Sequence, residues 1–121
     1  MTDFTSVSDH EWFEVVESAL DLVANTIEMS NPVSRNLPHC FVGIQQFDGG
    51  AAPVVATAGT YQVFIRTINT EIFEELCDSP IEADSPRTIN FAANLSGVRV
   101  VPLGIAGTPV TYKVVVTANG N

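Results

Sequence analysis

Apolar and polar residues alternate with a period of two along most of the second half of the chain. This period is typical of β-strands that bury one face. The clearest runs cover residues 61–66, 88–92, 98–100 and 112–117, with glycine, proline or asparagine between them. Strands at about ten-residue spacing, separated by turn signals, predict an all-β, antiparallel β-sandwich of the jelly-roll or immunoglobulin-like type. Residues 72–76 are a further candidate strand.

Residues 40–47 predict another strand, which follows a loop at 31–39 that holds two prolines and two asparagines. Alternation divides its side chains into two faces: Cys40, Val42, Ile44 and Gln46 against Phe41, Gly43, Gln45 and Phe47. Residues 48–59 are rich in alanine and glycine and predict a long connection. If the chain has an internal boundary, it lies in this connection.

The N-terminal part fits two structures. Residues 1–9 predict an arm, and residues 10–121 predict a single β-sandwich domain. Between 10 and 30, five apolar residues recur at helical spacing, namely Trp12, Val16, Leu20, Val23 and Ile27. The many β-branched and aromatic residues favour instead two strands at 12–16 and 26–29, with a turn or helical turn at 18–21. We expect the strands, with at most one short helix.

Charge adds information about partners. The chain has 121 residues, five basic against fourteen acidic residues, and a net charge of −9. Phosphate backbones and anionic membrane surfaces attract lysine and arginine, so we expect neither a nucleic acid nor a membrane as partner. The charge is unevenly distributed: residues 1–84 carry a balance of −12 and residues 85–121 a balance of +3. A solvated acidic face explains this, and so does a contact between unlike surfaces of two subunits.

No catalytic or metal-binding pattern emerges from the reactive residues. The only histidines are His10 and His39, and the only cysteines are Cys40 and Cys77. Neighbours on a strand point to opposite faces, so His39 and Cys40 do not form a nucleophile–base pair. No CxxC or HxxxH spacing indicates zinc, and the acids at 71–84 lack the loop of a calcium-binding EF-hand. We therefore expect no enzyme activity, no cofactor and no metal, and two reduced cysteines packed in or near the core.

Five stretches of the chain have a distinctive pattern: GTYQVFIRTINT at 59–70, SPIEA at 79–83, RTINFAANLSGVRVVPLGIAGTPVTYKVVVTANGN at 87–121, EWFEVVESALDL at 11–22 and TIEMSN at 26–31. Together they resemble small structural proteins of tailed-bacteriophage virions. The resemblance implies a place in the virion, as decoration of the head or as part of the neck, tail or fibre. It carries over no catalytic residue.

The expected function is therefore that of a non-enzymatic capsid decoration protein. It would bind and stabilise the assembled head, because a ligand that binds only the assembled state stabilises that state. Trp12 and Phe13 are the expected anchors for the major capsid protein or other virion proteins. Symmetric lattice sites favour symmetric partners, so a homo-oligomer is expected, with a trimer as one form. The alternative is a tail, fibre or neck component that binds a host receptor. Its candidate ligand-stacking aromatics are Tyr61 and Tyr112, although alternation directs both towards the core.

Overall fold

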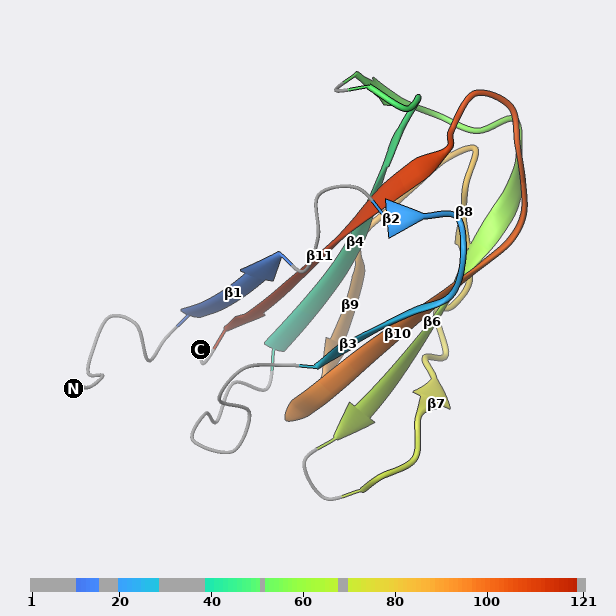
Figure 1. The fold of residues 1–121 in the computed structure, drawn as a ribbon. Helices are drawn as coiled ribbons and strands as arrows, with labels where there is room; N and C mark the ends of the chain where they lie inside the picture. The colour runs from blue at the N-terminus through green and yellow to red at the C-terminus, as the bar shows by residue number, and fades with distance from the viewer. Residues whose placement is uncertain (1–10, 16–19, 29–38, 51, 68–69, 120–121) are drawn as a thin grey trace.

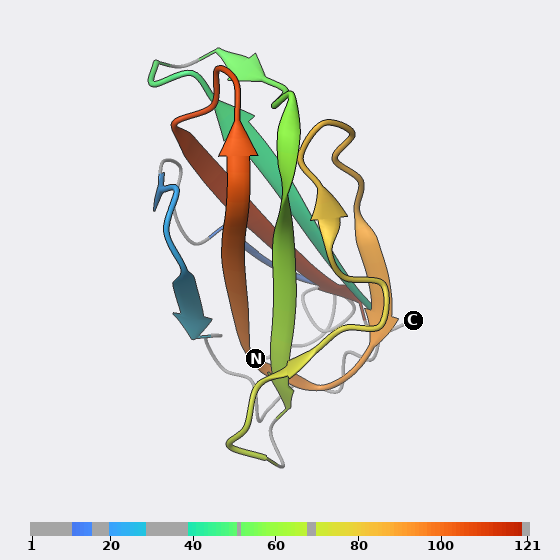
Figure 2. The ribbon, with the colours of Figure 1, turned by 90° about the vertical axis from the view of Figure 1, so that its right-hand side faces the viewer.

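The computed structural model describes residues 11–15, 20–28, 39–50, 52–67 and 70–119, and it describes side chains at 22–28, 40–50, 52–67 and 70–116. These residues form two antiparallel sheets packed face to face, and no helix occurs among them. Figure 1 shows the two sheets as separate layers, and Figure 2 shows one sheet in front with the strands of the other crossing behind it. The predicted all-β sandwich is confirmed.

The first sheet, sheet A, is built around two long strands, β4 (His39–Phe47) and β11 (Thr111–Asn119), which pair in register from end to end. Outside β11 lie β1 (Glu11–Val15) and β2 (Leu20–Asp21). Outside β4 lie β9 (Ile89–Ala92) and β5 (Pro53–Val54).

The second sheet, sheet B, has the same plan. Its central pair is β6 (Ala58–Thr67) and β10 (Leu95–Ala106). The outer strand beside β10 is β3 (Asn25–Glu28). The outer strands beside β6 are β7 (Glu74–Glu75) and β8 (Ile81–Glu82).

This strand order distinguishes between the two predicted sandwich types. If β1 with β2 and β7 with β8 are each counted as one interrupted strand, and the short β5 is set aside, eight strands remain in the described chain. We number these eight strands 1 to 8 along the chain. Side by side in space, they then follow the order 1-8-3-6 in sheet A and 2-7-4-5 in sheet B. Two sheets of four strands that exchange in this way form a jelly roll. The fold is therefore a jelly roll and not an immunoglobulin-like sandwich.

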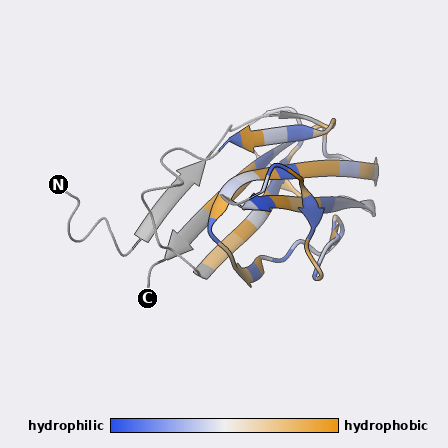
Figure 3. Ribbon diagram, turned by 90° about the horizontal axis from the view of Figure 1, so that it is seen from below, coloured by the Kyte–Doolittle hydropathy of each residue, from blue (hydrophilic) through white to orange (hydrophobic). Residues whose placement is uncertain are grey.

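The core lies between the sheets and follows the predicted alternation. In β4, the face that holds Cys40, Val42, Ile44 and Gln46 is buried. The other long strands contribute residues at every second position, namely Tyr61 and Val63 in β6, Val98 and Val100 in β10, and Tyr112, Val114 and Val116 in β11. Figure 3 shows the resulting alternation of apolar and polar positions along the strands. Burial of these side chains supplies the main favourable free energy of folding.

Both sheets end in short outer strands. Each outer strand is five residues long or shorter, whereas the four central strands have nine to twelve residues. Short, interrupted edge strands offer few consecutive unpaired backbone groups to another chain. Within the described residues, the sheet edges are therefore poor templates for strand addition.

Between residues 10 and 30, where the sequence fits either a helix or two strands, the described residues form strands. Strands β1 and β3 lie close to the predicted 12–16 and 26–29, and the short β2 occupies part of the expected turn at 18–21. The chain leaves sheet A after β2 and enters sheet B as β3 (Figure 1). The predicted arm at 1–9 lies outside the described residues.

Strand β10 extends beyond the predicted run at 98–100 and continues through Gly104 to Ala106. Beside it, Gly59 of β6 has a φ of 109°, and a Cβ there would lie 2.6 Å from the Cα of Ile105. Glycine at position 59 is therefore what allows the two backbones to approach, at the point where the β6–β10 register shifts between Leu103 and Ala106.

Candidate functional site

A hollow with an apolar lining lies on the outer face of sheet A. Its volume is about 320 Å³, and β4 and β11 form its floor while the segment before β9 forms one rim. The lining residues are Phe41, Gly43, Ile44, Gln45, Pro86, Arg87, Thr88 and Val115. An apolar depression on a sheet face is the kind of surface that receives a side chain from a partner protein.

The hollow exists because Gly43 has no side chain. Gly43 pairs with Val115 across the sheet, between the half-buried Phe41 on one side and Gln45 on the other. A Cβ at position 43 would meet only the Oγ1 of Thr88, at 3.5 Å, which is ordinary contact. The site therefore has room for a larger residue, and the open space is not required by the fold.

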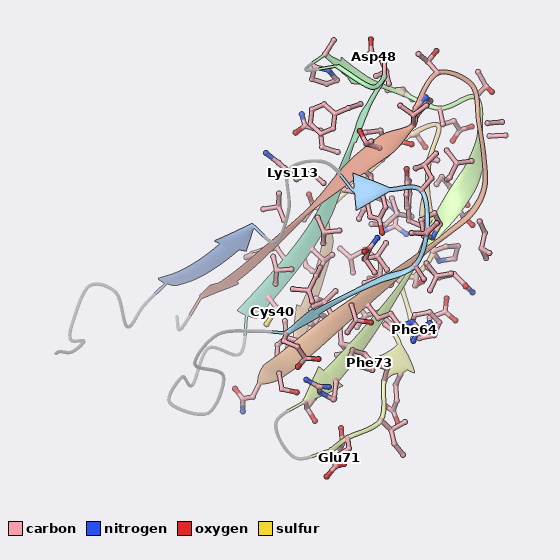
Figure 4. The ribbon with its side chains drawn as sticks, in the orientation of Figure 1. Cys40, Asp48, Phe64, Glu71, Phe73 and Lys113 are labelled. Atoms are coloured by element: carbon pink, nitrogen blue, oxygen red, sulfur yellow. The ribbon has the colours of Figure 1, made fainter. Side chains whose placement is uncertain are left out.

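One cation, Arg87, lines this hollow, and a second, Lys113, is the strand neighbour of a lining residue. Arg87 is on the rim, where its Nη2 donates a hydrogen bond of 2.6 Å to the carbonyl oxygen of Asp78. Lys113 is the cross-strand partner of Gln45 and projects from the outer side of sheet A (Figure 4). Among the lining residues of the hollow there is no aspartate or glutamate. In a chain with a net charge of −9, this part of sheet A favours a partner that carries carboxylates beside an apolar side chain.

The outer face of sheet B carries a different arrangement, centred on Arg66 of β6. Its guanidinium forms an ion pair with Glu28 of β3 and lies over the ring of Phe73, 5.0 Å from the ring centroid. It also donates to Ser96, through Nε to Oγ at 2.8 Å and through Nη2 to the carbonyl oxygen at 3.0 Å. Ser96 is available because the β6–β10 register shifts between Leu95 and Gly97.

Gly97 is the floor beneath this cluster. A Cβ there would lie 3.0 Å from Nη2 of Arg66 and 3.1 Å from Cζ of Phe73. The space above Gly97 is thus occupied by side chains of the same chain. A smaller hollow of about 250 Å³ remains beside the cluster, lined by Phe64, Phe73, Arg99 and Val101.

Hydrogen bonds in the interior tie the two sheets together. Tyr61 of β6 donates to Oε1 of Gln46 in β4 at 2.8 Å, and Nε2 of Gln46 donates to the carbonyl oxygen of Ala83 at 2.8 Å. The ring of Tyr61 packs against that of Tyr112 with centroids 5.3 Å apart. The Tyr112 hydroxyl donates to the carbonyl oxygen of Val23 at 2.9 Å. It also accepts a 2.9 Å hydrogen bond from Nδ2 of Asn25.

Burial shifts the pKa values of three interior groups. It raises the pKa of Tyr61 far above its ordinary value, with a smaller contribution from nearby Tyr112. It raises the pKa of Tyr112 as well, and the hydrogen bond from Asn25 opposes part of that rise. It raises the pKa of Cys40 to about 11, against a smaller opposite effect from the hydrogen bond to the carbonyl oxygen of Ala93. These groups are at most 1% exposed, so their shifts reflect a closed core and not a reactive cleft.

The cysteines are far from equivalent. Cys40 is buried and its Sγ donates to the carbonyl oxygen of Ala93 at 3.1 Å, as expected for a core position. Cys77 is exposed in the turn after β7, so the expectation that both cysteines pack in or near the core is wrong for Cys77. Residues 77 and 78 form a turn at the surface, where a small side chain has no neighbouring layer to pack against.

The acidic stretch 71–84 forms the outer strands of sheet B and their loops. Its carboxylates are exposed, and Glu75 accepts a 2.8 Å hydrogen bond from the Ser79 hydroxyl. In the part of the chain that the structure describes, no group of three or more histidine, cysteine, aspartate or glutamate residues could hold a metal ion. The same part contains no helix long and apolar enough to cross a membrane.

The two predicted anchors are in β1, at the edge of sheet A. The backbone register places Trp12 opposite Ala118 and Phe13 opposite Thr117, which in turn pairs with Phe41 of the hollow. Their side chains lie outside the described residues. The position of the hollow was missed from sequence, although the isolated glycine at 43 in a strand pattern was a signal for it.

A family model matches residues 12–121 of the chain, and its description is "Domain of unknown function (DUF7265)". The chain belongs to this family. A search of curated proteins gave no match to the DUF7265 chain. Among solved structures, one described as "Bacillus endospore appendages form a novel family of disulfide-linked pili" is similar with a TM-score of 0.42 and 12% identity, over 98% of this chain and 97% of that one.

Proposed function

We propose that this DUF7265 protein is a non-enzymatic structural component of a tailed-bacteriophage virion, acting as a capsid decoration protein. The observation that carries the proposal is the hollow at Gly43. Its lining offers an apolar floor and a cationic rim, but no acid–base pair or nucleophile beside a base. Such a surface is suited to hold a side chain of a protein partner. The resemblance of residues 59–70 and 87–121 to small virion proteins directs the proposal to the phage particle.

The proposed mechanism is binding to an assembled lattice. The outer face of sheet A would receive an apolar side chain of the major capsid protein, with Trp12 and Phe13 at the adjoining edge as further anchors. A capsid carboxylate beside that side chain would meet Arg87 and Lys113. Because the lattice site exists only in the assembled head, each bound copy stabilises the head by mass action. A homo-oligomer would match the symmetry of such lattice sites.

The alternative role, receptor binding by a tail, fibre or neck component, has lost its aromatic candidates. Tyr61 and Tyr112 are both 0% exposed, so neither ring is available to stack on a sugar. The alternative predicts a low copy number, and decoration predicts a high one.

The first experiment measures the copy number of the chain in purified particles by quantitative mass spectrometry against the major capsid protein. Decoration predicts a ratio near that of the capsid subunit or a simple fraction of it. A few copies per particle would place the protein in the neck, tail or fibre. Absence from particles would refute the virion role.

The second experiment tests the hollow itself. Gly43→Leu fills it, and we expect at least about tenfold weaker binding to heads that lack the protein, because a buried anchor side chain contributes about 2 kcal/mol. Gly50→Leu is the matched control, since a Cβ at exposed Gly50 also meets its nearest atom, Oδ1 of Asp48, at 3.5 Å. Equal binding by both variants would exclude this hollow as the docking site.

A further inference from the structure

The tip of the segment between β6 and β7 exposes an apolar side chain directly beside an apolar hollow. Ile72 is 71% exposed, the highest value among the exposed large apolar side chains of the described residues. The next residue, Phe73, lines the hollow on sheet B together with Phe64, Arg99 and Val101. Figure 4 shows Phe64 and Phe73 near each other on the outer side of sheet B, with Glu71 at the tip below them.

The hollow and the exposed side chain are complementary in size and polarity. The hollow has a volume of about 250 Å³. A protein cavity of about 150 Å³ accommodates a benzene molecule, so a branched aliphatic side chain fits here. The walls offer two phenyl rings and the Val101 side chain to such a group.

Charge complementarity points in the same direction. Arg99 is exposed at the hollow and has no ion pair within the described part of the chain, where the nearby Glu28 is engaged by Arg66 and Glu75 by Ser79. Glu71 is exposed next to Ile72. A segment that inserts an Ile72 side chain into the hollow therefore brings the carboxylate of Glu71 close to Arg99, which forms no ion pair among the described residues.

We propose that two copies of this chain associate through this end of sheet B, each inserting Ile72 into the other's hollow and placing Glu71 near the other's Arg99. The occupant is a second copy because both halves of the contact are present on one chain. The inserted side chain, Ile72, and one wall of the hollow, Phe73, are also adjacent in sequence. A two-fold axis beside Phe73 therefore brings the Ile72 of each copy to the hollow of the other. An isologous contact requires this self-complementarity.

The cluster around Arg66 keeps the receiving surface in place. Phe73 contacts both the Arg66 guanidinium and the backbone surface at Gly97, so one wall of the hollow is fixed before association. A preformed hollow avoids the entropy loss of ordering that wall on binding. This end of sheet B is separate from the hollow at Gly43, so the inference goes beyond the proposed capsid docking and does not depend on it.

The test measures the mass of the isolated full-length protein by sedimentation equilibrium over a range of concentrations. The wild type is expected to change from one to two copies of the 13.0-kDa chain as concentration rises. Ile72→Ser and Arg99→Glu are each expected to weaken association at least about tenfold, since each removes a buried apolar or charged contact. Both positions are exposed in the single chain, and circular dichroism would verify that the variants fold.

Two further variants make the result specific. Arg99→Glu combined with Glu71→Arg exchanges the charges and is expected to restore most of the lost association. Val110→Ser removes another exposed aliphatic side chain, from the connection between β10 and β11, and is expected to leave association unchanged. A wild type that stays monomeric, a dimer that Ile72→Ser does not weaken, or a three-copy assembly would each overturn the two-fold contact. None of these results bears on binding to capsids.

Discussion

Each sheet of the sandwich carries a glycine on the outward side of one of its two central strands: Gly43 in β4 and Gly97 in β10. Around Gly43 the space is open, and the nearest atom to an added Cβ is Oγ1 of Thr88 at 3.5 Å. Around Gly97 the space is filled by Arg66 and Phe73, at 3.0 and 3.1 Å from the same position.

The difference lies in the neighbouring strands. Beside Gly97, the register shift between Leu95 and Gly97 exposes Ser96 as an acceptor, and Glu28 supplies a carboxylate, so the Arg66 guanidinium has partners that hold it over the glycine. Beside Gly43, no such partner set occurs among the described residues, and Arg87 donates instead to backbone carbonyls on the rim side. The comparison shows that glycine on a sheet face has no fixed role: nearby polar partners determine whether the chain fills the space itself.

The largest expected effect comes from adding the same side chain at both glycines. Gly97→Val is expected to lower the free energy of unfolding by about 2–3 kcal/mol, because its methyl groups displace Arg66 and Phe73. Gly43→Val is expected to change it by less than about 0.5 kcal/mol, because the site is open and valine favours strands. Urea unfolding followed by linear extrapolation measures both values. Similar losses in the two variants would contradict the distinction between a filled and an open face.

A smaller effect is expected from removing the hydroxyl of each interior tyrosine. Tyr61→Phe leaves Oε1 of Gln46, a residue that is 1% exposed, without its donor, and is expected to lower the free energy of unfolding by about 2 kcal/mol. Tyr112→Phe is expected to lower it by about 1 kcal/mol, because its partners Val23 and Asn25 are near the surface, where water replaces the hydroxyl. The same unfolding measurement applies to both. A greater loss in Tyr112→Phe would mean that water replaces the hydroxyl of Tyr112 less readily than that of Tyr61.

The fold was largely predictable from sequence because the long central strands carry a strict period-two pattern. The buried faces of β4 and β11 follow directly from that pattern. The jelly-roll order did not follow, because it depends on which strands pair between distant parts of the chain. The extension of β10 through Gly104 was missed for a related reason: pairing with β6 outweighs the local tendency of glycine to turn.

The candidate surfaces were less predictable than the fold. The hollow at Gly43 arises from three segments, β4, β11 and residues 86–88, whose proximity no local pattern encodes. The same holds for Arg66 and Phe73, which lie in contact although they come from β6 and from the segment before β7. Alternation did correctly place Tyr61 and Tyr112 in the core, since that conclusion needs only the strand and its buried face.

The smallest expected effect concerns the interior behind sheet A at high pH. Burial raises the pKa of Cys40 from 9.0 to about 11, so above pH 9 the unfolded chain releases this proton before the folded one does. The folded state then binds more protons than the unfolded state, and stability must fall as pH rises through this window. At pH 10 this group accounts for a loss of about 1 kcal/mol relative to pH 8.

Cys40→Ala removes that contribution, so its free energy of unfolding is expected to decline less between pH 8 and 10 than that of the wild type. Both proteins also titrate Tyr61 and Tyr112, whose raised pKa values add a further decline above pH 10. The measurement is urea unfolding at pH 8, 9 and 10 under reducing conditions, with Cys77→Ala as the control for loss of an exposed thiol. Identical pH dependence in Cys40→Ala and the wild type would mean that water reaches the thiol. The core would then be open to solvent beside β4 of sheet A.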